Sequence, residues 1–111
     1  MIDPKKLKKL RFEIDEKDIK QVDENFLKGI KHIKERHYTE AIKWLQLSEC
    51  PESPLIIAAL AFKVGDEFLF EEYIEEPFVK KCGVNIYLIY DNNKIPLAKE
   101  NLLNLKEKLS S

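Results

Sequence analysis

The chain has few of the residues from which catalytic sites are built. Its 111 residues include only three glycines, too few for a glycine-rich loop that binds phosphate through backbone N–H groups. It contains no Gly-x-Gly-x-x-Gly or P-loop motif. No serine is accompanied by a histidine and an acid in a pattern typical of nucleophilic catalysis. The sequence therefore predicts a protein without enzyme activity.

Cysteine and histidine are equally scarce. Cys50 and Cys82 are the only cysteines, too few for the disulfide framework of a small secreted domain, and they form no Cys-x-x-Cys pair. We expect two reduced thiols and no disulfide. His32 and His37 are five positions apart, which on a continuous helix separates them by about 140°. The spacing predicts no metal site, and we expect no cofactor.

The chain also lacks an excess of one charge and a long apolar run. Its 19 basic and 20 acidic residues give a formal net charge of −1, which removes the bulk attraction that supports nucleic-acid binding. The longest apolar run, Leu55 to Phe62, is far shorter than the roughly 20 residues that span a membrane. No apolar segment follows the first charges, so no secretory signal is expected. We expect one cytoplasmic domain, residues 1–111, without membrane contact.

Apolar spacing predicts two helical hairpins. Steps of three and four predict a helix over residues 18–36, and a second helix, capped by Thr39, ends before Pro51; together they form a hairpin over 18–50. Ser53 and Pro54 then cap and open an apolar helix that ends at Gly65. The next helix runs to Pro77 and completes a hairpin over 53–77. Its acidic residues fit a solvated face better than a catalytic acid–base pair; they are Glu67, Glu71, Glu72, Glu75 and Glu76.

The last third of the chain has two interpretations. Residues 84–90 are β-branched and aromatic enough for a strand leading into the turn at 91–93, which predicts an α+β protein with a β-hairpin at 84–97. An isolated two-stranded hairpin is only marginally stable, which favours the other interpretation, a helix over the same residues. With the amphipathic helix of Leu102, Leu105 and Leu109, this makes a third helical hairpin over 79–109.

A regular internal spacing supports the helical interpretation. Similar turn-and-helix segments place Ala41, Phe70 and Ala98 at steps of 29 and 28 residues, which is typical of stacked helical hairpins. The predicted fold class is therefore all-α, an array of about three antiparallel hairpins. Residues 1–17 are then a basic segment that either caps the first hairpin as a short amphipathic helix or is a mobile lysine-rich end.

The first hairpin resembles the tetratricopeptide repeat. Gly29, Tyr38, Ala41 and Leu45 match the family's small, aromatic, small and apolar positions, and Pro54 lies near its inter-repeat proline. The second unit has a phenylalanine, Phe70, where the family has a small residue, and the units are shorter than the family's 34 residues. The resemblance implies a right-handed superhelix. In length and architecture the chain also resembles the small chaperones of bacterial type III secretion needle subunits.

In such a superhelix the first helix of each hairpin lines a concave surface, and most of the matching side chains here are apolar. These positions are Phe26, Ile30, Ile33, Lys34, Leu55, Ala59, Phe62, Lys63, Tyr87 and Tyr90. The resemblance implies a non-catalytic interaction module, small chaperone or adaptor that binds a peptide or amphipathic helix of another protein. Self-association as a homodimer covers the same surface, and so does closure by the chain's own terminal helices.

A second function class rests on the basic N-terminal segment. Its basic residues are Lys5, Lys6, Lys8, Lys9 and Arg11. A cluster of this kind can contact phosphate, so an RNA-binding or nucleic-acid-associated accessory protein is the alternative function.

Overall fold

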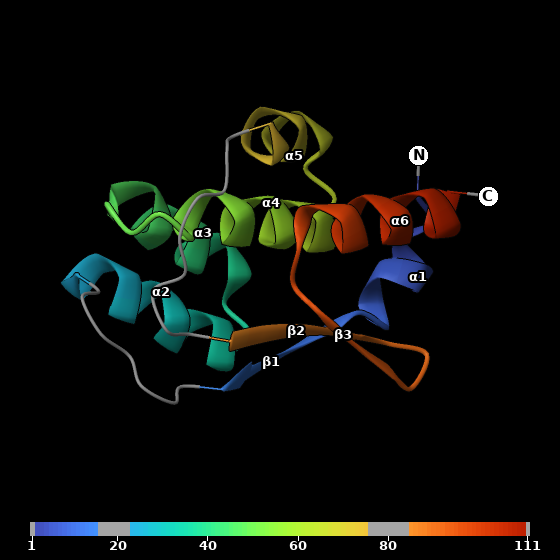
Figure 1. Ribbon diagram of the computed structural model, residues 1–111, viewed down its shortest axis with the longest axis horizontal. Helices are drawn as coiled ribbons and strands as arrows, with labels where there is room; N and C mark the ends of the chain where they lie inside the picture. Colours follow the sequence, from blue (N-terminus) through green and yellow to red (C-terminus); the bar gives the residue numbers. More distant parts are fainter. Residues whose placement is uncertain (1, 16–22, 76–84, 111) are drawn as a thin grey trace.

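The computed structural model describes residues 2–15, 23–75 and 85–110. These residues form six helices and three strands, and one of the helices, α4, lies at the centre of the molecule (Figure 1). In chain order the elements are α1 (Pro4–Lys8), β1 (Arg11–Asp15), α2 (Glu24–Lys34), α3 (Tyr38–Leu47), α4 (Ser53–Val64), α5 (Glu67–Ile74), β2 (Asn85–Tyr90), β3 (Asn93–Pro96) and α6 (Lys99–Ser110).

Helices α2 to α5 form the two expected hairpins, and each helix packs against the next. Gly65 ends α4 with a φ of 81°, a left-handed conformation that glycine adopts without strain. Two expected caps are wrong. Helix α3 begins at Tyr38, before Thr39, and α4 includes Ser53 as its first residue; neither has a side-chain cap at its N-terminus.

Helix α4 is apolar on nearly all sides because it separates two hydrophobic clusters. Leu55, Ala59 and Phe62 face the first cluster, which includes apolar residues of α1, α5, α6 and β2. Ile57 and Leu60 face the second cluster, which includes apolar residues of α2, α3 and β2. Figure 1 shows the consequence: α4 runs through the middle of the molecule, with other elements above, below and at both ends.

A three-stranded antiparallel sheet corrects the predicted all-α class. Its order is β1-β2-β3, and the central Leu88 pairs with Phe12 on one side and Ile95 on the other. The protein is therefore α+β. The third unit, expected as a helical hairpin over 79–109, consists in its described part of the β2–β3 hairpin followed by α6. The alternative of a β-hairpin at 84–97 fits.

Strand β1 is the physical reason for this difference. Residues 11–15 alternate charged and apolar side chains, the period of a strand with one buried face. Phe12 and Ile14 are half-buried and pack against the second cluster. Because β1 adds a third strand, the β2–β3 pair is not an isolated hairpin, and the marginal stability that weighed against the strand interpretation does not apply. Within residues 2–15, the described part of the expected capping helix is limited to α1.

The cysteine prediction is also wrong. Cys50 is disulfide-bonded and is 5% exposed in the connection between α3 and α4. Cys82 lies outside the described residues. The count of two cysteines argued against a multi-bridge framework, but a count does not exclude a single bond.

In the described part of the chain, each helix is too short or too polar to cross a lipid bilayer.

Candidate functional site

The ten residues expected to line a concave groove lie mainly in the protein core. Six of them are buried, with exposed fractions of 7% or less: Phe26, Ile30, Ile33, Leu55, Ala59 and Phe62. The first three pack in the cluster that contains Ile86 of β2, and the other three pack in the cluster that contains Leu88. The sheet and the terminal helices complete these clusters. The chain itself thus covers most of the surface that the resemblance to tetratricopeptide repeats assigned to a partner.

The other four groove residues are more accessible, and Tyr87 and Tyr90, three positions apart on β2, lie on opposite faces of the sheet. Lys34 is exposed, and Tyr87 and Tyr90 are half-buried on β2. Tyr87 stacks under the ammonium of Lys94 at 4.4 Å. Lys63 donates a hydrogen bond to the backbone oxygen of Leu7. Partner binding through these four residues stays a prediction.

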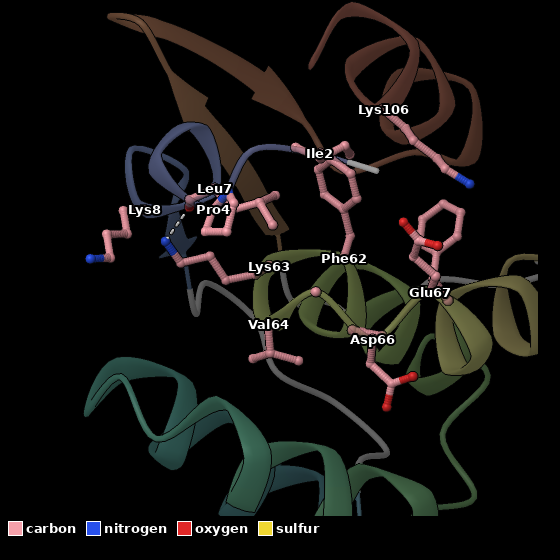
Figure 2. Close-up of a pocket in the computed structure, with 13 residues that line it drawn as sticks. Ile2, Pro4, Leu7, Lys8, Phe62, Lys63, Val64, Asp66, Glu67 and Lys106 are labelled. Carbon is pink, nitrogen blue, oxygen red and sulfur yellow. Dashed lines mark hydrogen bonds between the residues drawn. The ribbon is translucent and has the colours of Figure 1, made fainter. Parts of the chain in front are cut away.

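A different hollow lies where α1, α6 and the turn between α4 and α5 meet (Figure 2). Its volume is about 570 Å³, and its lining residues are Ile2, Pro4, Leu7, Lys8, Ala61, Phe62, Lys63, Val64, Gly65, Asp66, Glu67, Phe70 and Lys106. We call this hollow the α4-end pocket. Its volume falls within the range of roughly 300 to 1,000 Å³ typical of ligand pockets.

The walls of the α4-end pocket are mainly apolar. Phe62 and Phe70 form a tilted aromatic pair, with ring centroids 5.8 Å apart, and the Lys106 ammonium lies 4.7 Å from the Phe70 ring centre. Val64 is 43% exposed and so offers an apolar contact that solvent reaches. These features suit an apolar group inserted between α1, α4 and α6.

Charged groups of both signs surround this apolar interior. Lys8, Asp66 and Glu67 are exposed. Burial lowers the pKa of the Lys63 ammonium below its usual range, and the positive charge of Arg36 lowers it further. The pocket therefore combines an apolar floor with a rim that carries both positive and negative side chains. Such a rim can orient a bound segment without favouring one net charge.

The pocket could not be read from periodicity, because it combines segments from both ends and the middle of the chain. One local signal was available: Gly65 and Asp66 mark a sharp turn at the end of an apolar helix, and Val64 precedes that turn. Without the positions of α1 and α6, nothing indicates that this turn lies beside an unfilled space.

The basic N-terminal segment is partly committed to the fold. The Lys6 ammonium donates a hydrogen bond of 3.4 Å to the backbone oxygen of Leu109, which ties α1 to α6, and Lys63 ties α1 to α4 in the same way. Lys5, Lys8 and Lys9 are exposed. Nucleic-acid binding by this segment stays a prediction.

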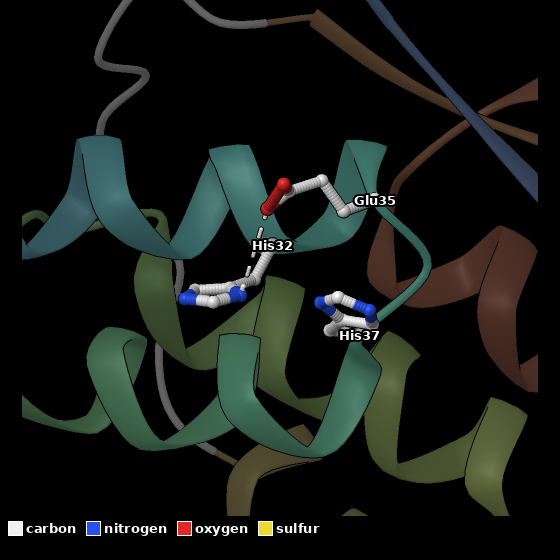
Figure 3. Close-up of side chains that lie close together, drawn as sticks. All are labelled: His32, Glu35 and His37. Atoms are coloured by element: carbon white, nitrogen blue, oxygen red, sulfur yellow. Dashed lines mark ion pairs between the residues drawn. The ribbon is translucent and has the colours of Figure 1, made fainter.

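The side chains of His32 and His37 lie close together, although a continuous helix would point them about 140° apart. Helix α2 ends at Lys34, and Arg36 has a φ of 64°. The amide of His37 donates to the His32 oxygen at 2.8 Å, and the amide of Arg36 donates to the Ile33 oxygen at 3.0 Å. This is the Schellman pattern of helix ends. The helical angle therefore does not apply to His37, and the turn brings it back towards His32 (Figure 3).

Comparisons of the chain with protein-family models, with curated proteins and with solved structures find no match.

Proposed function

We propose that the protein is a non-catalytic interaction module, a small adaptor or chaperone, that receives an apolar side chain of a partner's peptide or amphipathic helix in the α4-end pocket. The pocket itself is the observation that carries this proposal: about 570 Å³ of mainly apolar space at the surface. A helix that places one apolar residue every three or four positions fits a short apolar hollow with a charged rim.

The resemblance to tetratricopeptide repeats is part of the proposal. The succession of packed helices from α2 to α5 and the close approach of Gly29 to Ala41 support it. The resemblance places partner binding on the concave face of the helical array, but six of the ten residues expected on that face are buried within this chain. We therefore assign binding to the end of the helical array.

The cytoplasmic location also remains a proposal. The expectation of two reduced thiols supported this location, but Cys50 is disulfide-bonded. Disulfides persist mainly in oxidising compartments. The binding proposal does not depend on the compartment.

Site-specific photo-crosslinking tests the pocket directly. A photoreactive phenylalanine analogue replaces Val64, which lines the pocket and is 43% exposed. The matched control carries the analogue at Leu27, which is 44% exposed on α2 and does not line this pocket. After illumination in the native cell, mass spectrometry identifies the crosslinked peptide. We expect a partner segment with helical apolar spacing at Val64 and not at Leu27.

A binding measurement completes the test. A synthetic peptide of the crosslinked segment is titrated against the parent protein and against Val64→Asp and Leu27→Asp. Val64→Asp should weaken binding by roughly tenfold or more, since it places a charge against an apolar anchor, while Leu27→Asp should bind like the parent. Equal crosslinking at both positions, or equal affinity of both variants, contradicts the proposal. Crosslinks only to a second copy of the chain replace the proposed partner with a homodimer.

A further inference from the structure

Three side chains that commonly bind metal ions meet at the turn between α2 and α3, away from the α4-end pocket. One nitrogen of His32, one of His37 and a carboxylate oxygen of Glu35 all lie within 4.8 Å of one another. Figure 3 shows the three side chains converging on one point. They form the one group of this kind within residues 2–15, 23–75 and 85–110.

The backbone turn explains why these side chains converge. His32 occupies the third-last position of α2, and His37 is the second residue after the helix cap, Glu35. In the Schellman pattern these two positions are joined by a backbone hydrogen bond and their side chains commonly contact each other, usually through apolar groups. Here both positions carry imidazoles, with ring centroids 5.9 Å apart. The turn holds them together without a metal ion.

His32 also has an unused coordinating atom. Its Nδ1 is buried and has no hydrogen-bond partner; the nearest Glu35 carboxylate oxygen is 3.9 Å away, too far for a hydrogen bond. A buried polar atom without a partner is destabilising and calls for an explanation. An ion between the imidazole and the carboxylate satisfies both groups at once.

We propose that His32, Glu35 and His37 bind a divalent transition-metal ion, with Zn²⁺ as its natural occupant. Two imidazoles and one carboxylate are a common ligand set for Zn²⁺, with bonds of about 2.0 to 2.2 Å. At tetrahedral angles such bonds place neighbouring ligand atoms about 3.3 Å apart. The exposed side chains of Glu35 and His37 reach this spacing by rotating towards the half-buried His32.

The electrostatic surroundings set the strength of this site. The C-terminal end of α2 carries the negative pole of the helix dipole, which favours a cation. Lys31, Lys34 and Arg36 are exposed close by in the sequence and oppose a dication. We therefore expect one ion of moderate affinity, which joins the end of α2 to the start of α3 and leaves a coordination position for water.

Calorimetric titration with ZnCl₂ tests the site on the full chain prepared without a polyhistidine tag. We expect one ion per chain, and we expect the Tm to rise by roughly 10 °C at a hundredfold excess of free zinc over Kd. In NMR spectra, the ring nitrogens of both histidines should shift in parallel with saturation. Shifts of only one ring, or none, at millimolar zinc overturn the proposal.

Substitutions separate this site from general binding to surface carboxylates. His32→Ala and His37→Ala should each weaken zinc binding by roughly tenfold or more, and Glu35→Gln should also weaken it. The matched control is Glu24→Gln, which removes an exposed carboxylate at the other end of α2 and should bind zinc like the parent. His37 is exposed, so its variant should fold normally. Unchanged affinity in His37→Ala, or equal losses in Glu24→Gln and Glu35→Gln, contradicts the assignment.

Discussion

At the scale of single residues, Gly29 and Ala41 set the distance between α2 and α3. A Cβ atom added to Gly29 would lie 2.7 Å from the Cγ of Leu45 and 3.4 Å from the backbone oxygen of Ala41. Ala41 is fully buried. The two small residues therefore lie where α2 and α3 approach each other closely.

Enlarging Ala41 should destabilise this hairpin. Ala41→Leu adds bulk where α2 and α3 are too close to accommodate a larger side chain. We therefore expect a loss of about 1 to 3 kcal/mol in the free energy of unfolding, measured by urea denaturation. Ala41→Ser should cost less. Lys43→Leu, on the exposed side of the same helix, is the control and should have little effect. An Ala41→Leu protein as stable as the parent would show that the two helices are not in contact there.

Asp23 connects the start of α2 with the end of α3. Its carboxylate accepts hydrogen bonds from the amide of Phe26 at 2.7 Å, the hydroxyl of Ser48 at 3.0 Å and the amide of Glu49 at 2.7 Å. Burial raises the pKa of this carboxyl, but the hydrogen bonds from Glu49, Phe26 and Ser48 together lower it below 3.8. The charged form of Asp23 thus stabilises the fold.

Removing this carboxylate should have a pH-dependent effect. Asp23→Ala should cost about 1 to 3 kcal/mol at pH 7, whereas Asp3→Ala, at the exposed cap of the short α1, should cost less. Because the folded-state pKa is lowered, the contribution of Asp23 is present above its unfolded pKa and is lost as pH falls through the folded one. The difference in the free energy of unfolding between the parent and Asp23→Ala should therefore shrink below pH 3.8. A difference that is constant with pH contradicts this role.

At the scale of elements, the helices outside residues 84–90 were predictable, the β-hairpin at 84–97 was predicted only as an alternative, and strand β1 was not predicted. The stripe of Leu102, Leu105 and Leu109 lies on one face of a helix, and all three residues are buried in α6. Residues 85–90 carry no such unambiguous period, and their state depends on pairing with β1, at least 70 positions earlier in the chain. Local spacing does not report a distant pairing partner, so the sequence left both interpretations open.

The β2–β3 turn offers a test of strand formation. Asp91 and Asn92 have φ values of 51° and 66°, as in the two-residue turns that match the twist of a hairpin. Asn92→Gly should keep or raise stability, since glycine adopts this conformation without strain. Asn92→Val should cost about 1 to 2 kcal/mol, measured by thermal denaturation. Equal Tm values for the two variants would contradict the turn.

At the scale of the whole molecule, the candidate sites depend on how distant segments meet. Six of the ten groove residues are buried in two separate clusters, and the sequence did not show that the sheet and terminal helices help to enclose them. The α4-end pocket requires α1 and α6 to lie beside the end of α4. The histidine cluster depends on where α2 ends, because Arg36 reverses the chain. The spacing of apolar residues along the sequence does not show where the chain reverses direction or which distant segments pack together.

The central claim is that β1 and the β2–β3 hairpin form a sheet that closes the helical array. Nuclear Overhauser effects in a spectrum of the isotope-labelled protein test it directly. The structure predicts cross-strand contacts between Phe12 and Leu88 and between Leu88 and Ile95, which are paired in register. Contacts between residues three positions apart throughout 85–96, without cross-strand contacts, would contradict the sheet and restore the all-helical array.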